Sequence, residues 1–280
     1  MNLNVAIINY NDYLNTINFI NSIKDYQIIN NIVVVDNNSS DNSVNELNKL
    51  NIPNLKVIKN PSNSGYGEGI NIAARYLINN RIGGVLLVCN TDIEIKSEND
   101  LVTMLNEYND HNVAVVAPII DENGTIRYGF KIATIKEELL LSLPFVYQKY
   151  LDKYRFYSEY SHYVDCIMGC MFMVRLDVLE KINFFDSNMF LYYEENVLGI
   201  KLKSIGMKSV VAKDVIVKHN HSVTIDKSIN RVNKYKALKQ SQRYYLKNYL
   251  KANFIQLFAF DIIVFFFDLA LRIKLLFKKG

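Results

Sequence analysis

The sequence predicts an α/β fold in which a mostly parallel central sheet is flanked by helices. Two short runs of β-branched residues without helical periodicity, NVAIINY at 4–10 and NIVVVD at 31–36, predict strands, the second one buried on both faces. Between them, TINFINSIKDY at 16–26 carries apolar residues three and four positions apart, which predicts an amphipathic helix. Because this alternation continues along the chain, we expect helices on both faces of a parallel sheet.

The later elements follow from the same patterns. We expect a helix at 43–51, which Ser40 or Asp41 can cap. The elements expected after it are a strand at 55–60, a glycine loop at 61–69, a helix at 70–80, strands at 84–90, 114–120, 125–130 and 164–175, helices at 176–183 and 194–206, and a strand at 209–219. Residues 136–163 are unassigned, and the pattern is helical from about residue 228. The expected domains are therefore 1–227, of the Rossmann-like α/β type, and a helical region at 228–280.

Composition narrows the class of protein. The chain has 280 residues, half of them hydrophobic, which is enough for a sizeable core. A formal net charge of +4 is too mild to indicate nucleic-acid binding. Cys89, Cys166 and Cys170 lie in apolar runs and lack the second half of a zinc site, so we expect them buried and reduced. No basic segment or cleavage site precedes the first strand, which favours a cytoplasmic body.

The apolar tail at 254–277 differs from the rest. It is long enough for a bilayer core at about 1.5 Å per residue. However, Asp261, Asp268, Arg272 and Lys274 interrupt it, and a charge at the centre of a spanning helix costs roughly 2.5–3.5 kcal/mol. The first three share one helix face, so the tail is expected to be an amphipathic helix at the membrane interface. The alternative is a helix packed on the body or on a second subunit.

Polar residues follow the ends of three predicted strands. Tyr10 follows the first, Asp36 ends the second, and Asn90-Thr91-Asp92 ends another. The carboxyl ends of parallel strands meet at one edge of a sheet, where α/β proteins bind ligands. Asp36 can accept the imino N–H of a uracil or thymine ring near Tyr10, and Asp92 can hold Mg²⁺ or Mn²⁺ together with substrate phosphates. The alternative for Asp36 and for Asp92 is that each caps the helix that follows.

A glycine loop, NSGYGEGIN at 63–71, lies between a predicted strand and a helix. Such a loop lets backbone N–H groups approach phosphates at a helix N-terminus. Its G-x-G-x-G spacing and its place after the third strand do not fit the dinucleotide fingerprint, and no G-x-x-x-x-G-K is present. A simple turn is the alternative.

Two later motifs carry titratable groups. Glu194 and Glu195 lie at a predicted helix start, where acidic residues also occur for electrostatic reasons alone. One of them can be a general base that removes a proton from an acceptor hydroxyl. Adjacent residues do not share a helix face, so one at most is expected to point into a site. His219 follows a strand, where it can bind a metal or be a structural residue.

Taken together, the chain resembles a family 2 glycosyltransferase of the GT-A fold, and it is most similar to the bacterial rhamnosyltransferase-like branch that builds surface polysaccharides. Seven segments carry the resemblance in order, from about residue 3 to 250: VAIINYN, IVVVDNNSSDNS, NSGYGEGIN, LLVCNTDIE, VDCIMGCMFMVR, FFDSNMFLYYEENVLGIKLKSIGMK and VKHNHSVT.

The resemblance implies an inverting transfer of a sugar, with Mn²⁺ or Mg²⁺ as cofactor, from a nucleotide-diphosphate donor. It implies dTDP-L-rhamnose as donor and a lipid-linked oligosaccharide as acceptor. It also implies a peripheral location on the inner face of the cell membrane and association into a homodimer. Glu195 is the implied base and Glu194 the reserve, and the implied metal ligands are Asp92 and His219. The implied donor-binding residues are Asn9, Tyr10, Asp36, Asn38, Asn63, Gly65, Gly69, Asn71, Asn90, Thr91 and Asp92.

Three positions depart from the family pattern. Asn90 replaces the first Asp of the D-x-D motif, Glu195 replaces the usual Asp, and Val197 lies where the family is often acidic. The alternatives are a UDP-sugar donor (glucosyl, galactosyl or galactofuranosyl) and a non-catalytic partner subunit of similar fold. A nucleotidyltransferase is disfavoured, because no glycine-rich, lysine-bearing loop follows the first strand. Acceptor selection is expected in residues 136–163, since loops on a fixed scaffold carry specificity.

Overall fold

The computed structural model describes residues 1–143, 146, 156–220 and 231–277. Its centre is a ten-stranded sheet with the order β3-β2-β1-β4-β9-β6-β10-β5, to which β7 adds beside β6 and β8 beside β10. The strands are β1 (Leu3–Asn9), β2 (Ile29–Asp36), β3 (Leu55–Lys59), β4 (Val85–Cys89), β5 (Ile93–Glu94), β6 (Val113–Glu122), β7 (Thr125–Arg127), β8 (Tyr163–Val164), β9 (Met171–Arg175) and β10 (Lys208–His219).

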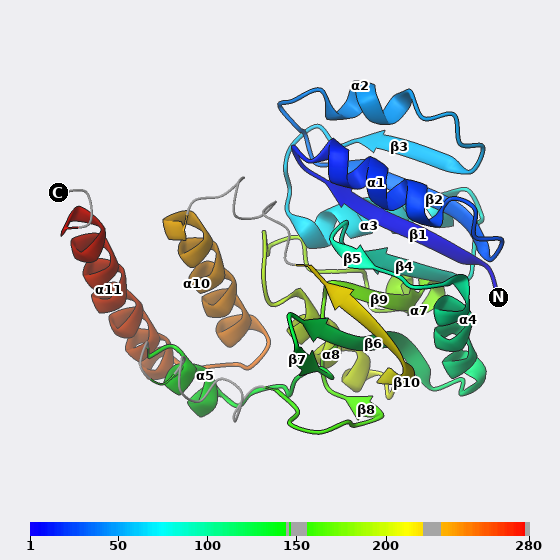
Figure 1. The fold of residues 1–280 in the computed structure, drawn as a ribbon. Helices are drawn as coiled ribbons and strands as arrows, with labels where there is room; N and C mark the ends of the chain where they lie inside the picture. Colours follow the sequence, from blue (N-terminus) through cyan, green and yellow to red (C-terminus); the bar gives the residue numbers. More distant parts are fainter. Residues whose placement is uncertain (144–145, 147–155, 221–230, 278–280) are drawn as a thin grey trace.

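Helices cover both faces of the sheet (Figure 1). They are α1 (Tyr13–Ile23), α2 (Ser43–Asn48), α3 (Tyr66–Asn79), α4 (Glu98–Asn106), the 3-10 turn η1 (Glu107–Asn109), α5 (Ile135–Leu141), α7 (Leu176–Lys181), α8 (Glu194–Ser204), α10 (Arg231–Asn248) and α11 (Phe254–Phe277). One apolar core contains Phe19 of α1 and Leu101 of α4, and the other contains Leu77 of α3 and Leu198 of α8. The predicted α/β fold class is confirmed.

The sheet is mixed rather than parallel throughout. Strands β3, β2, β1 and β4 are parallel neighbours, but β9 is antiparallel to both β4 and β6. The expected strand at 164–175 is in fact two strands, β8 and β9, with a loop between them. An apolar run predicts a buried strand but not its direction, because a strand buried on both faces reads the same either way.

Two other boundaries differ from expectation. Helix α3 begins at Tyr66 rather than near residue 70, so two glycines of the loop lie inside its first turn. Helix α5 occupies part of the unassigned segment 136–163; residues 144–145 and 147–155 of that segment lie outside the described residues.

The C-terminal helices form an antiparallel pair. Arg243 of α10 binds Asp261 of α11 through two hydrogen bonds of 2.7 and 2.8 Å, and the Tyr235 ring lies 5.0 Å from that of Phe267. Helix α10 packs on the body through a cluster of buried residues that contains Met189, Tyr193, Val197 and Tyr245, here called the tyrosine cluster. In the described part of the chain, no helix has both the length and the apolar character needed to cross a membrane.

Candidate active site

The strand pair β1–β2 ends on a hydrogen-bonded polar group. Asn9 and Asp36 are register partners and both are buried. The Asp36 carboxylate accepts hydrogen bonds from Asn9 Nδ2 at 2.7 Å, from the Ser39 backbone N–H at 2.9 Å and from Ser39 Oγ at 2.6 Å. Asp36 does not cap α2; Asp41 Oδ1 instead accepts from the Ser43 N–H at 3.0 Å. Asp36 therefore holds the turn after β2 in a fixed shape.

Two further candidates lie beside this group. Tyr10 is half-buried directly after β1, and Asn38 is exposed in the turn after β2. Asn38 has a φ of 62°, a left-handed conformation that asparagine tolerates better than most residues. Exposed side chains on a turn fixed by Asp36 are well placed to meet a ligand at this edge of the sheet.

The glycines of the 63–71 loop are explained by close packing. Gly65 has a φ of 95°, and a Cβ there would overlap the Phe190 carbonyl group. A Cβ at Gly69 would lie 3.0 Å from the Ile8 side chain. Asn71 is buried, and it accepts a hydrogen bond from Phe185 N at 2.9 Å and donates to Phe185 O at 3.0 Å. The loop thus fastens α3 to β1 and to the segment before α8.

Asn63 is half-buried at the start of the same loop, where its Oδ1 accepts from Gly65 N at 3.2 Å. Of the four loop residues assigned to the donor, Gly65, Gly69 and Asn71 make contacts that serve packing. These contacts supply a physical reason for the glycine pattern that needs no phosphate.

Asp92 is not a helix cap. Helix α4 begins at Glu98, and Ser97 and Asp100 form its capping box. The Asp92 carboxylate lies instead 3.3 Å from His219 Nε2, with both side chains about one-tenth exposed. Their backbones meet as well, because β5 pairs with the end of β10 and Asn220 N donates to Asp92 O at 3.0 Å. The fold therefore joins two candidate metal ligands that are far apart in the sequence.

His219 lies between several acidic groups. Its Nδ1 is 3.7 Å from Glu122 Oε1, and Arg127 Nε is 3.7 Å from Glu122 Oε2. Burial lowers the pKa of His219, but hydrogen bonds with Asp92, Cys170 and Glu122 outweigh it and raise the pKa to about 12. A positive charge is therefore strongly favoured at this position.

The Asp92–His219 pair fits a divalent cation that is shared with a substrate. Within the described ranges, no group of three or more His, Cys, Asp or Glu side chains is arranged to hold a metal ion. Mg²⁺ is usually held by one or two carboxylates, with substrate phosphates and water completing the shell. Asp92 matches that description, and His219 can add an imidazole ligand only as the neutral ring, so a bound cation would have to displace its proton.

Glu194 and Glu195 lie at the start of α8 in different surroundings. Glu194 is buried, and burial together with the charge of Glu195 raises its pKa to about 8. Glu195 is less buried, and its carboxylate occupies the space that a Cβ at Gly169 would need. Burial and the neighbouring carboxylate thus favour the protonated form of Glu194 at neutral pH.

Tyr66 connects these carboxylates to the end of β4. Its hydroxyl lies 3.0 Å from Asn90 Oδ1 and 3.4 Å from the Gly169 carbonyl oxygen. Burial raises the pKa of Tyr66 well above its usual value, with further contributions from the nearby Cys89, Cys170 and glutamates. Thr91 is half-buried beside Asn90. The site thus continues from Asn90 through Tyr66 to Glu195.

Sequence reasoning missed Tyr66, Glu122, Arg127 and Cys170 as residues of this region. Tyr66 lies between Gly65 and Gly67, and the pattern of glycines alone was interpreted in this loop. The other three come from β6, from β7 and from the residue before β9, and only the pairing of these strands brings them near His219. No local sequence signal identifies them.

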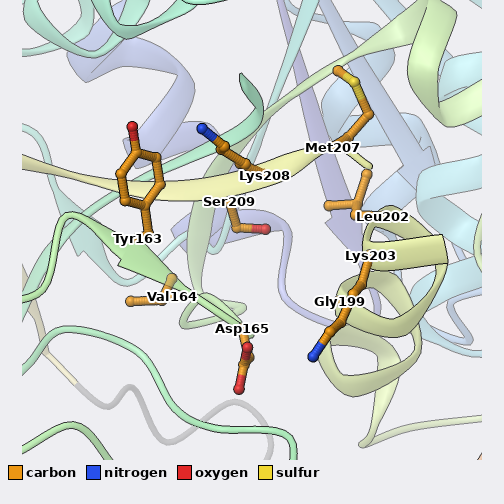
Figure 2. A pocket seen from close by; sticks show the side chains of 9 residues that line it. All are labelled: Tyr163, Val164, Asp165, Gly199, Leu202, Lys203, Met207, Lys208 and Ser209. Atoms are coloured by element: carbon orange, nitrogen blue, oxygen red, sulfur yellow. The ribbon is translucent and has the colours of Figure 1, made fainter. Parts of the chain in front are cut away.

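A separate cavity of about 240 Å³ lies elsewhere, lined by residues that include Tyr163, Asp165, Lys203 and Lys208 (Figure 2). It adjoins the first residues of β10, whereas His219 is the last. The cavity and His219 therefore lie at opposite ends of a strand of 12 residues. This cavity is therefore not part of the candidate active site.

The family model described as glycosyl transferase family 2 matches residues 4–182. The mannosyltransferase PcManGT from Pyrobaculum calidifontis, in complex with GDP-Man and Mn²⁺, is similar in structure, with a TM-score of 0.56 at 14% identity over 94% of this chain and 73% of that one. S. aureus TarS 1-349 has a TM-score of 0.53 at 15% identity over 89% of this chain and 66% of that one. These likenesses show the GT-A fold. No curated protein sequence matches the chain.

Proposed function

The chain belongs to glycosyl transferase family 2, and from this premise we propose that it is an inverting, metal-dependent hexosyltransferase of surface polysaccharide synthesis. The donor we propose is dTDP-L-rhamnose, and the acceptor is a lipid-linked saccharide. The observation that carries the proposal is the Asp92–His219 contact after the sheet strands, together with the connection from Asn90 through Tyr66 and Gly169 to the Glu195 carboxylate. This combination provides for a charged leaving group and for a proton acceptor.

The donor is proposed to lie across the strand ends. The pyrimidine ring of the nucleotide would contact Tyr10 and the turn held by Asn9 and Asp36, with Asn38 beside it. The path toward the diphosphate would be lined by Asn63, Asn90 and Thr91. Asp92 and His219 would hold the cation; when bound, it neutralises charge on the leaving diphosphate. Arg127, 3.7 Å from Glu122, adds positive charge on the same side.

Glu195 is proposed as the base. A base must be ionised near neutral pH, and burial raises the pKa of Glu194 to about 8, which makes Glu194 the poorer candidate. Glu195 would take the proton of the acceptor hydroxyl while that oxygen attacks the anomeric carbon and the bond to the diphosphate breaks. Its carboxylate packs against Gly169, whose carbonyl oxygen lies 3.4 Å from the Tyr66 hydroxyl.

The departures from the family pattern have structural partners. Val197 is buried in the tyrosine cluster, against α10. Asn90 accepts the hydrogen bond of Tyr66. Each of these two residues therefore has a structural role in this fold.

Membrane association is proposed through α11, which lies beyond α10 at one end of the molecule (Figure 1). Asp261 is bound to Arg243, so this acidic side chain of the helix faces α10. The exposed large apolar side chains of the helix, each at least 42% exposed, are Phe254, Ile255, Phe258, Ile262, Phe265, Phe266 and Leu269. Lys247 and Lys251, in the residues before this helix, are exposed. An apolar face preceded by exposed lysines suits an anionic lipid surface.

Binding to lipid vesicles tests this contact. The protein is expected to float with anionic phospholipid vesicles and to bind neutral ones more weakly, and Phe265→Glu with Phe266→Glu should abolish binding. Leu14→Glu, at an exposed apolar position on α1, is the matched control. A concentration-dependent dimer that the double variant abolishes, without vesicle binding, would identify a second subunit as the occupant instead.

The enzymatic test is a donor panel with a polyprenyl-linked acceptor and Mn²⁺ or Mg²⁺. We expect glycolipid product and free nucleoside diphosphate from dTDP-L-rhamnose. Product from a UDP-sugar alone would correct the donor. Nucleotide binding without turnover of any donor would contradict the proposal and favour the partner subunit.

A further inference from the structure

A buried polar cluster joins three separate elements beside the catalytic helix. Glu138 of α5 is 2% exposed. Its Oε2 accepts hydrogen bonds from Tyr193 Oη at 2.6 Å and from Gln242 Nε2 of α10 at 2.7 Å. A buried carboxylate is costly unless it is hydrogen-bonded, so these two donors hold α5, α10 and the residue before α8 together.

Tyr193 has an unfavourable backbone conformation. It is the residue immediately before Glu194 and has a left-handed φ of 71°, which is unfavourable for a side chain of this size. Such a conformation persists when the surroundings over-determine it. Here the hydroxyl is bound to Glu138, and the ring packs 5.0 Å from that of Tyr245, also of α10.

We propose that the Glu138–Tyr193–Gln242 cluster positions the start of α8, so that α10 is part of the catalytic apparatus although it contacts no substrate. This inference rests on the proposed function of the glutamate pair. Tyr193 is the positioning residue: its bonds fix the backbone from which Glu194 and Glu195 project. The C-terminal helices thereby determine the geometry of a site whose other residues come from the sheet.

A second contact supports the same conclusion. Ser241, the residue before Gln242, donates to the Leu191 carbonyl oxygen at 2.7 Å. Helix α10 therefore binds the segment before α8 at both Leu191 and Tyr193. Because a displacement of about 1 Å in a catalytic group can cost up to about 100-fold in rate, this double attachment affects catalysis as well as folding.

The chain provides a matched control for Tyr193. The Tyr249 hydroxyl also donates to a carboxylate at 2.6 Å, that of Asp186, and its ring packs against the same tyrosine cluster. Tyr193→Phe and Tyr249→Phe therefore delete the same group from the same kind of hydrogen bond. They differ in that Tyr193 adjoins the glutamate pair and Tyr249 does not.

The experiment compares the two variants in the full-length protein. For Tyr193→Phe we expect kcat to fall by about 10- to 100-fold with the KM for donor unchanged, and backbone hydrogen exchange over 192–200 to become at least about tenfold faster. For Tyr249→Phe both quantities should stay near those of the wild type. Equal losses of kcat in the two variants, or an unchanged kcat in Tyr193→Phe, would overturn the proposal.

The exchange measurement separates this inference from the proposed function. If the wild type turned over no donor, the proposed function would fail, and exchange over 192–200 would still decide whether the cluster holds α8. A charge swap provides the second test: Gln242→Glu places two buried carboxylates together and should impair activity, and adding Glu138→Gln should restore most of it. A double variant no better than Gln242→Glu alone would contradict the role of the cluster.

Discussion

The two sides of the site use polar side chains differently. At the ends of β1 and β2, Asn9, Asp36 and Ser39 bind one another at 2.6–3.2 Å. On the β4–β10 side, burial and the charge of Glu195 raise the pKa of Glu194, and interactions with Asp92, Cys170 and Glu122 raise the pKa of His219 despite its burial. The first arrangement maintains a shape and the second maintains unusual ionisation states. Perturbed ionisation is characteristic of sites that perform chemistry.

Of all the substitutions on the two sides, we expect the largest loss of activity at Glu195. Replacing it by Gln keeps the volume and removes the proton acceptor, so kcat should fall by about 10²- to 10⁴-fold. Steady-state kinetics on the preferred donor provide the measurement, with the melting temperature as a check on folding. If Glu194→Gln showed the larger loss, the assignment of the base would be reversed.

A smaller loss is expected when Glu195 is displaced rather than removed. In Gly169→Ala the new methyl group would overlap the Glu195 carboxylate, so the base must move. We expect kcat to fall by about 10- to 100-fold. Gly83→Ala is the control, because a Cβ there meets nothing within 4 Å. Equal activity of the two variants would show that the position of Glu195 is not critical.

On the β1–β2 side the main effect should be on stability. Asp36→Asn puts an N–H₂ group where two oxygens accept from Asn9 and Ser39, so at least one buried donor loses its partner. The expected cost is about 1–3 kcal/mol in the free energy of unfolding, read from urea denaturation. If Asp36→Asn were as stable as the wild type, the structural role of the polar group on the β1–β2 side would be contradicted.

The mildest effect concerns the pH dependence of stability. The pKa of Glu194 is raised from 4.5 to about 8, so between these values the folded chain keeps a proton that the unfolded chain releases. The free energy of unfolding should therefore fall as pH rises through this window, by up to about 1.4 kcal/mol per pH unit. Glu194→Gln removes this contribution, while Glu180→Gln, at an exposed position, should retain it. A slope that survives in Glu194→Gln would contradict the raised pKa.

Much of the fold follows from the sequence. Hydrophobic periodicity located β1, β2, β3 and β4 and the helices between them, and strand ends predicted where polar residues such as Asp36 and Asp92 would gather. The direction of β9 could not be predicted, because a strand buried on both faces gives the same apolar run whether it is parallel or antiparallel to its neighbours.

The parts of the site that were missed depend on tertiary contacts. Tyr66 reaches Asn90 and Gly169 only after α3 has packed on the sheet, against β1 and β2. The link from Glu138 to Tyr193 and Gln242 joins elements about fifty residues apart or more. Local patterns carry no information about such contacts.

The central claim is that Asp92 holds a cation shared with a nucleotide-diphosphate sugar. The most direct measurement is thermal unfolding with dTDP, UDP, GDP or CMP, each with and without Mn²⁺ or Mg²⁺, in the wild type and in Asp92→Ala. A nucleotide at 100 times its Kd should add about 2.7 kcal/mol to the stability of the wild type. We expect this gain to need the metal and to be lost in Asp92→Ala. An equal gain without metal, or one that Asp92→Ala retains, would contradict it.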